Sequence, residues 1–277
     1  MSGPARSGVV KQITSLANPM VKEIRALALP KNRKASGLFV AEGLKLVADA
    51  VAAGWTVRTL VYASTVGAQP LVSRLAATTH AKGGDVLAVS EAVLAKISRR
   101  DNPQTVIGVF EQSLTPAASI KPKAGEVWVA LESVRDPGNL GTIIRTADAV
   151  GAAGVILIGD TVDPFSVEAV RATMGSVFAV PIARASRTEF QKIAGAWPGT
   201  IVGTHLAATM DYRKADYRTP VLLVMGGEQA GLTAETAALA KTLVKIPMAG
   251  KADSLNLAVA TAVMLFEIRR GALTLDG

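Results

Sequence analysis

The stretch VWVALESVRDPGNLGTIIRTADAVGAAGVILIG, residues 127–159, contains two apolar runs on either side of a turn and a helical segment. The runs VWVALES and GVILIG have the length and β-branched content of buried strands. Between them a Pro-Gly pair indicates a turn, and Asn139 is a candidate N-cap for a helix that buries Ile143 and Ile144. A strand, a helix and a second strand in this order predict an α/β fold with a mostly parallel sheet.

Arg145 lies among the apolar positions of this helix. Burying a guanidinium group without an anionic partner is costly. Two placements are therefore open: the side chain faces solvent, or a negatively charged group meets it.

The same alternation of strands and helices extends in both directions. The first part predicts helices over residues 19–29, 44–53, 70–81 and 91–97, strands over 38–43, 57–64, 85–90 and 105–112, and a basic turn at 31–34. The second part predicts further strands over residues 177–183, 200–206, 220–227 and 242–248, and helices over 166–174, 187–196, 233–240 and 254–270. We expect a smaller α/β sandwich domain over residues 1–113, flexible over 1–11, then a linker at 114–125 and a second α/β domain at 126–277.

Composition excludes several classes of site. The chain of 277 residues has no cysteine and two histidines, so we expect no disulfide, no cysteine nucleophile and no metal site. No apolar run reaches the length that spans a bilayer, and the first ten residues lack the apolar block of a secretory signal. A reducing, cytoplasmic location without membrane contact is the expectation.

The charge is unevenly distributed. Residues 1–120 contain 14 Lys and Arg against 7 Asp and Glu, whereas residues 121–277 contain 16 against 15. Such asymmetry favours a polyanionic partner for the first part. A solvated basic surface is the alternative.

Two further stretches follow predicted strands. In VLLVMGGEQAGL, residues 221–232, the glycine order is G-G-x-x-x-G, which is not the fingerprint of a dinucleotide-binding turn. This argues against a nicotinamide-dependent oxidoreductase, although an ordinary strand-to-helix turn stays open. In VKIPMAGKADSLNLAVATAVMLFEIRR, residues 244–270, Ser254 is a candidate N-cap and Asn256 is polar within an apolar helix. Capping alone would explain both; the helix itself requires cover on all sides.

Together the three stretches resemble, in order, the signature motifs of the SpoU/TrmH family of SPOUT-class RNA 2′-O-ribose methyltransferases. The first motif is matched by Asn139, Gly141 and Arg145, the second by the glycines around Glu228 with Leu232, and the third by Ile246, Pro247, Met248, Ser254, Leu255 and Asn256. The first part resembles, through NPMVKEIRAL and LFVAEGLKLVADAVAAG, the RNA-substrate-binding domain that many members carry.

The resemblance implies methylation of a ribose 2′-hydroxyl in structured RNA with S-adenosyl-L-methionine as cofactor. It implies a deep trefoil knot in the second domain and a homodimer formed through that domain. The implied cofactor-binding residues are Gly226, Gly227, Ile246, Met248 and Leu255.

The implied catalytic residues are Arg145, Asn139, Glu228, Ser254 and Asn256. Arg145 would hold an RNA phosphate and stabilise the developing alkoxide, because arginine keeps its charge near neutral pH. Asn139 would position the ribose or Arg145, and the other three would organise the pocket.

The basic first part would then contact RNA phosphates. The candidates for these contacts are Lys31, Arg33, Lys34, Arg99 and Arg100. We favour large-subunit (23S) ribosomal RNA as substrate. A tRNA 2′-O-methyltransferase, an antibiotic-resistance ribosomal RNA methyltransferase and a non-catalytic RNA-binding protein are the alternatives.

Overall fold

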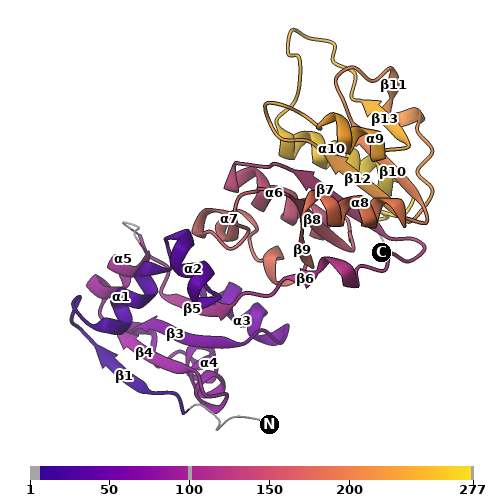
Figure 1. The fold of residues 1–277 in the computed structure, drawn as a ribbon. Helices are drawn as coiled ribbons and strands as arrows, with labels where there is room; N and C mark the ends of the chain where they lie inside the picture. Colours follow the sequence, from indigo (N-terminus) through magenta and orange to yellow (C-terminus); the bar gives the residue numbers. More distant parts are fainter. Residues whose placement is uncertain (1–6, 99–101, 276–277) are drawn as a thin grey trace. The chain divides into compact units, whose positions relative to one another are not determined.

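A computed structural model describes residues 7–98 and 102–275. Contacts divide the chain into two compact units, one formed by Met1–Gln112 with Phe165–Phe178 and the other by Ser113–Pro164 with Ala179–Gly277. The sequence did not predict that Phe165–Phe178 belongs to the first unit. The chain therefore passes from one unit to the other three times (Figure 1).

The first unit contains a mixed five-stranded sheet of order β1-β4-β3-β5-β2. Strand β4 pairs in parallel with β1 on one side and with β3 on the other. Strand β5 is antiparallel to both of its neighbours, β3 and β2. Its strands are β1 (Val10–Ile13), β2 (Leu38–Glu42), β3 (Val57–Ala63), β4 (Asp85–Val89) and β5 (Val106–Glu111). Strand β1 was not predicted, and its first residues lie in the segment that we expected to be flexible.

Helices cover both faces of this sheet. The helices are α1 (Pro19–Ala26), α2 (Pro30–Ser36), α3 (Leu44–Ala52), α4 (Pro70–Ala81), α5 (Glu91–Ser98) and α7 (Val167–Ala172), with short 3₁₀ turns η1 (Ser64–Val66) and η3 (Ser176–Phe178). Alternate residues of β2 point to opposite faces: Val40 joins the aliphatic core under α1 and α5, whereas Phe39 packs against the rings of Phe110, Phe165 and Phe178. These ring contacts explain why Phe165–Phe178 folds with this unit.

The second unit is built on an eight-stranded, all-parallel sheet of order β11-β13-β10-β12-β7-β8-β9-β6. Its strands are β6 (Thr115–Pro116), β7 (Val127–Glu132), β8 (Gly154–Ile158), β9 (Ile182–Ala185), β10 (Thr200–Thr204), β11 (Met210–Asp211), β12 (Val221–Met225) and β13 (Thr242–Lys245). The predicted α/β architecture with a mostly parallel sheet is confirmed. The trefoil knot stays a prediction.

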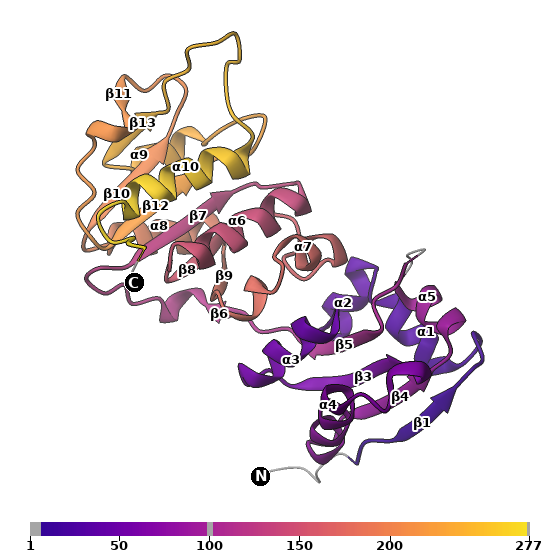
Figure 2. The ribbon, with the colours of Figure 1, turned by 180° about the vertical axis from the view of Figure 1, so that it is seen from behind.

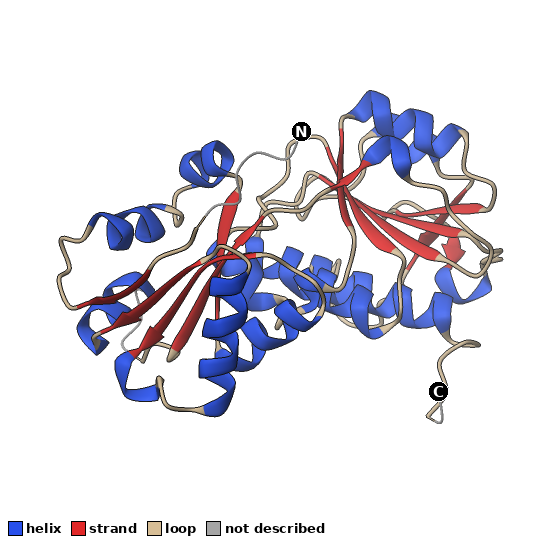
Figure 3. Cartoon of the chain, turned by 90° about the horizontal axis from the view of Figure 1, so that it is seen from below, coloured by secondary structure: helices blue, strands red, loops and turns tan. Residues whose placement is uncertain are grey.

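The helices of this unit fall into two groups. They are α6 (Pro137–Ala149), α8 (Arg187–Gly195), α9 (Ala234–Leu239) and α10 (Leu257–Arg269), with 3₁₀ turns η2 (Ala117–Ser119) and η4 (Tyr212–Lys214). Helices α6 and α10 pack against each other (Figure 2), and α8 contacts α9 and η2. Figure 3 shows helices on both sides of the strands. Each of the long strands β7, β8 and β12 is buried along its whole length, as expected for a parallel sheet between layers of helices.

Several local predictions were wrong. The residues predicted as a basic turn, 31–34, lie inside α2, and Pro30 is the first residue of this helix. The predicted strand 177–183 is a 3₁₀ turn followed by β9, because Phe178 joins the aromatic cluster of the first unit. The segment predicted as a linker contributes β6, η2 and the buried Ala117 to the second unit.

The N-caps also differ from the prediction. Pro137 occupies the first turn of α6, so the cap is Asp136, whose Oδ1 accepts from the backbone amide of Asn139 at 2.6 Å. Helix α10 starts at Leu257, and its cap is Asn256 rather than Ser254. The Asn139 side chain is therefore available for other contacts.

Candidate active site

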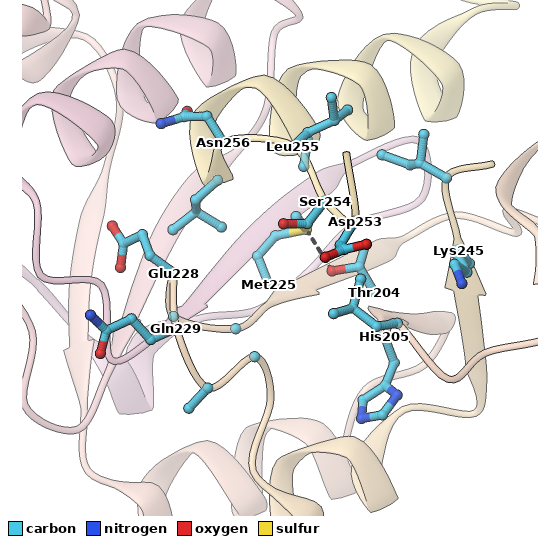
Figure 4. A pocket seen from close by; sticks show the side chains of 18 of the residues that line it. Thr204, His205, Met225, Glu228, Gln229, Lys245, Asp253, Ser254, Leu255 and Asn256 are labelled. Atoms are coloured by element: carbon cyan, nitrogen blue, oxygen red, sulfur yellow. Dashed lines mark hydrogen bonds between the residues drawn. The ribbon is translucent and has the colours of Figure 1, made fainter. Parts of the chain in front are cut away.

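A cavity of about 560 Å³ lies where β10, β12 and β13 end and α10 begins. Figure 4 shows its lining side chains, which come from four segments. The lining residues are Thr204, His205, Leu206, Met225, Gly226, Gly227, Glu228, Gln229, Ala230, Gly231, Val244, Lys245, Ile246, Met248, Asp253, Ser254, Leu255, Asn256, Leu257 and Ala260. The carboxyl ends of parallel strands are where open α/β sheets hold ligands.

The glycines of the loop after β12 allow it to fold back on itself. A Cβ at Gly226 would lie 2.0 Å from the carbonyl carbon of Gly231, so only glycine fits there. Gly231 has φ +67, a left-handed conformation that glycine adopts without strain, and its amide donates to the Gly227 carbonyl at 3.0 Å. The stretch after β12 is therefore a strand-to-helix turn, the alternative that the sequence left open, and the same turn also lines the cavity.

Hydrogen bonds connect the three stretches that the sequence singled out. The Oδ1 atom of Asn256 caps α10 by accepting from the amides of Ala258 and Val259. Its Nδ2 donates to Asn139 Oδ1 at 2.9 Å, and Asn139 Nδ2 donates to Glu228 Oε1 at 3.0 Å. Because the helix amides fix which end of Asn256 is the acceptor, the direction of every bond up to the Glu228 carboxylate is fixed.

These contacts affect the ionisation of Glu228. Partial burial raises the pKa of its carboxyl group, but donation from the Asn139 side chain and from the backbone around it outweighs burial and lowers the pKa overall. Glu228 is therefore ionised at neutral pH and accepts hydrogen bonds at the edge of the cavity.

Glu132, at the end of β7, holds the far end of the same loop. Its side chain is 1% exposed, and it accepts from the Thr233 amide, the Thr233 hydroxyl and the Thr236 hydroxyl at 2.8–2.9 Å. Thr233 is the N-cap of α9, the helix that follows the loop. We did not predict this residue, although a carboxylate at the end of an apolar strand was a visible signal.

Arg145 lies on the exposed side of α6. It makes no hydrogen bond or ion pair with another described residue, and it does not line the cavity. Of the two placements open to it, the structure shows the solvent-facing one, which leaves the guanidinium available to an incoming anion.

The structure thus brings together most of the predicted residues. The five predicted cofactor residues, Gly226, Gly227, Ile246, Met248 and Leu255, all line the cavity, as do Glu228, Ser254 and Asn256. Asn139 is bonded to two of the lining side chains. Sequence reasoning missed the contributions of β10 and β13 at Thr204, His205 and Lys245, because a strand order that places β10 between β12 and β13 cannot be read from one chain.

The basic residues predicted to contact RNA differ in their exposure to solvent. Lys31 and Lys34 are exposed on α2. Arg33 is 2% exposed, and its Nη1 donates to the carbonyl oxygens of Leu27 and Ala28, so it closes the turn between α1 and α2 and does not lie on the surface with the two lysines. Arg99 and Arg100 lie outside the described residues.

Neither a metal centre nor a membrane span is indicated for the described part of the chain. Residues 7–98 and 102–275 hold no group of three or more His, Asp or Glu side chains that could bind a metal ion. No helix in these ranges is long and apolar enough to cross a bilayer.

Comparison with known protein families gives two matches. Residues 126–266 match the SpoU rRNA Methylase family, and residues 18–108 match the MRM3-like substrate binding domain. The first match contains every residue of the hydrogen-bonded path from Asn256 to Glu228.

Similar proteins extend over nearly the whole chain. A crystal structure of an AdoMet-bound rRNA methyltransferase from Sinorhizobium meliloti has a TM-score of 0.91 and 58% identity, covering 96% of this chain and 99% of that chain. The 23S rRNA (uridine(2479)-2′-O)-methyltransferase of Streptomyces viridochromogenes is 31% identical over 96% of this chain and 94% of that protein. An uncharacterised tRNA/rRNA methyltransferase of Synechocystis is 33% identical over 94% of both chains.

Proposed function

The chain belongs to the SpoU rRNA Methylase family, and on this premise we propose that it transfers the methyl group of S-adenosylmethionine to a ribose 2′-hydroxyl of 23S ribosomal RNA. The observation that carries this proposal is that two of the three stretches line one cavity and that the first is joined to them by the hydrogen bonds between Asn256, Asn139 and Glu228.

The cavity fits the cofactor in size and in chemistry. Its volume of about 560 Å³ lies within the range of small-molecule sites, about 300–1,000 Å³. Ile246, Met248 and Leu255 offer apolar surface for an adenine ring, and the turn at Gly226 exposes backbone groups that can bond its edge. Asp253 lines the same cavity and offers a carboxylate to the amino group of the methionine part.

When bound, the cofactor supplies a methyl group on a sulfonium centre. The residues of this chain have the task of holding the ribose oxygen in line with that group. Glu228 is ionised and held by Asn139, and it fixes the loop that forms one wall of the cavity. Asn256, at the other end of the hydrogen bonds through Asn139, fixes the start of α10. These three residues act by positioning.

Arg145 provides the charge. A 2′-hydroxyl is a weak acid, and a fixed cation stabilises the alkoxide that develops as its proton leaves to water or to a phosphate oxygen. A guanidinium also grips a phosphate with two parallel hydrogen bonds and keeps its charge. An arginine that no described residue neutralises suits both tasks.

We further propose that the protein acts as a homodimer through α10. Val259 and Phe266 of this helix are 49% and 51% exposed and lie seven residues apart, on one face. An apolar face of this kind is covered by a partner in a stable assembly. Because α6 packs against α10, the same interface lies beside the helix that carries Arg145.

The first unit has the role of recruiting RNA. Its match to a substrate binding domain and the basic excess of the first part support this role. Lys31 and Lys34, exposed on α2, are the described residues that we assign to phosphate contacts. A cytoplasmic location follows from ribosomal RNA as substrate.

The proposal is tested by substituting Arg145. Arg145→Ala should lower the transfer of tritiated methyl groups to 23S ribosomal RNA by about a hundredfold or more, as for other lost transition-state contacts. Its affinity for S-adenosylmethionine, measured by calorimetry, should stay within about twofold, because Arg145 does not line the cavity. Lys192→Ala, on the exposed surface of α8, is the control.

Two outcomes would contradict the proposal. Normal turnover by Arg145→Ala would remove the assigned role of the cation. Failure of the unaltered protein to bind S-adenosylmethionine would reject the enzymatic function and favour an RNA-binding protein that does not catalyse a reaction. Mapping the 2′-O-methylated nucleotide identifies the target and separates ribosomal RNA from tRNA.

A further inference from the structure

A smaller pocket lies within the first unit and shares no lining residue with the active-site cavity. Its volume is about 250 Å³, and β2 and α7 both contribute to its walls. Leu46, Val167 and Val170 make the walls apolar, and Gln104, Arg171 and Met174 add polar and flexible side chains. The pocket is smaller than the roughly 300 Å³ at which sites for drug-sized molecules begin, so its occupant is a small group.

Two different parts of the sequence build this pocket. Leu46 and Gln104 lie within the match to the MRM3-like substrate binding domain, at residues 18–108. Val167, Arg171 and Met174 lie far from it in sequence, inside the methylase match. The substrate-binding unit is therefore completed by a segment that its own family model does not contain.

Arg171 gives the pocket an incompletely used donor group. Its Nη2 donates to Glu42 Oε1 at 2.9 Å and to the Ser98 carbonyl at 3.0 Å. Its Nε is buried and makes no hydrogen bond with another described residue. Since buried donors in native proteins are usually paired, this nitrogen has a hydrogen bond to offer to an acceptor that enters the pocket.

The ion pair between Arg171 and Glu42 also determines what the pocket can accept. The Glu42 side chain is 5% exposed and balances the charge of the guanidinium group. A phosphate would add a second negative charge beside a buried carboxylate, which is unfavourable. An uncharged group with a carbonyl or ring-nitrogen acceptor satisfies Nε without that cost.

Met174 is held in a conformation that needs an explanation. Its φ is +51, in the left-handed region, and its side chain is 72% exposed although it lines the pocket. The next residue is Gly175, with φ +112, where a Cβ would lie 3.0 Å from Leu46 Cδ1. Such strain in a residue other than glycine is concentrated at functional sites.

We propose that this pocket holds one unpaired base of the RNA substrate. The base packs between the apolar wall and the Met174 side chain, and its acceptor edge receives the Arg171 Nε–H. Gln104 is exposed, its side chain makes no hydrogen bond to another described residue, and it offers both a donor and an acceptor to the same edge. Proteins read single-stranded RNA in this manner, by enclosing splayed bases and bonding their edges. The inference rests on the proposed function, because it assumes that the first unit binds the RNA to be methylated.

The test uses the full-length protein and labelled RNA. The probes are fluorescein-labelled single strands about eight nucleotides long, of U, A, C and alternating G and U, together with a duplex of matched length. Binding is followed by fluorescence anisotropy. Gln104→Ala and Met174→Gly are the test variants, since neither side chain is in the core and glycine relieves the strain at position 174. Gln69→Ala and Leu16→Ala, both on the exposed surface of the same unit, are the matched controls.

We expect both test variants to bind the preferred single strand about tenfold more weakly, with melting temperatures no lower than that of the unaltered protein. The controls should bind normally. A probe that contains 4-thiouridine should form a photo-crosslink to the peptide carrying Gln104 or the peptide carrying Met174.

The proposal is overturned if the variants bind as tightly as the unaltered protein, if no single strand binds, or if the duplex binds equally well and the crosslinks map elsewhere. Calorimetry with S-adenosylmethionine separates the two proposals. Absence of cofactor binding rejects the methyltransferase function, whereas insensitivity of RNA binding to both substitutions rejects the base pocket alone.

Discussion

Removal of the Glu132 carboxylate tests whether this buried group holds the cavity loop in place. In Glu132→Ala, the Thr233 amide and the hydroxyls of Thr233 and Thr236 lose their acceptor. Hydrogen bonds to a charged group contribute about 1.5–3 kcal/mol each. Removing the carboxylate also removes its own desolvation cost, so we expect a net loss of about 3–5 kcal/mol. Arg187 adds little to this value, because its side chain is 57% exposed and lies 3.8 Å away.

Glu132→Gln separates charge from volume. Glutamine keeps the shape and one acceptor oxygen, so the expected loss is smaller, about 1–2 kcal/mol. The assay is urea unfolding followed by tryptophan fluorescence, since Trp128 and Trp197 both lie in the core of the larger sheet. Glu235→Gln, an exposed substitution in the first turn of α9, is the control and should cost less than about 1 kcal/mol.

Glu132→Ala and Glu132→Gln should also weaken cofactor binding, because Glu132 holds Thr233, the residue that ends the loop lining the cavity. Calorimetry at a temperature where both proteins are folded measures this effect. A loss of stability below about 1 kcal/mol in Glu132→Ala would refute the argument, since it would show that the three donors find other acceptors without cost.

Three further substitutions or conditions test other parts of the site. Gly226→Ala places a Cβ 2.0 Å from the Gly231 carbonyl carbon, so the loop must move, and calorimetry should show at least about tenfold weaker binding of S-adenosylmethionine. The pKa of Glu228 is lowered from 4.5, so its ionised form stabilises the folded state at neutral pH, and this contribution is lost as the pH falls below 4.5. The melting temperature of Glu228→Gln should therefore approach that of the unaltered protein in acid; a constant difference would contradict the assignment. Phe266→Glu puts a charge on the exposed face of α10 and should shift a dimer to monomer in sedimentation velocity, whereas a monomeric unaltered protein would reject the interface.

The sequence predicts well what depends on local pattern. Helix α4 occupies the predicted residues 70–81, because Pro70 marks its start and its apolar residues recur with helical spacing. The second and third motif stretches line one cavity and the first is bonded to them through Asn139, because each stretch follows or precedes a strand of the same parallel sheet.

Packing partners and competing local contacts that the sequence pattern does not show account for the errors. Phe178 is apolar and follows a strand-like pattern, yet it leaves the larger sheet to join the rings around Phe39. Arg33 has the charge of a surface residue, but carbonyl oxygens at the end of α1 satisfy its guanidinium group inside the protein. The residue type of Asn139 predicts a cap, but Asp136 takes that role and leaves the side-chain amide of Asn139 for Glu228. In each case the deciding partner lies elsewhere in the chain or competes for the same local position.

The passage of Phe165–Phe178 into the first unit has a consequence for how such a protein can be divided or recombined. A gene fragment ending at residue 112 would leave Phe39 without the rings of Phe165 and Phe178, and Phe110 without that of Phe178. The remaining fragment would carry Phe165 and Phe178 without these partners. Neither half is an independent cassette. Swapping the N-terminal half between relatives to redirect target choice would require exchanging this fourteen-residue insertion with it.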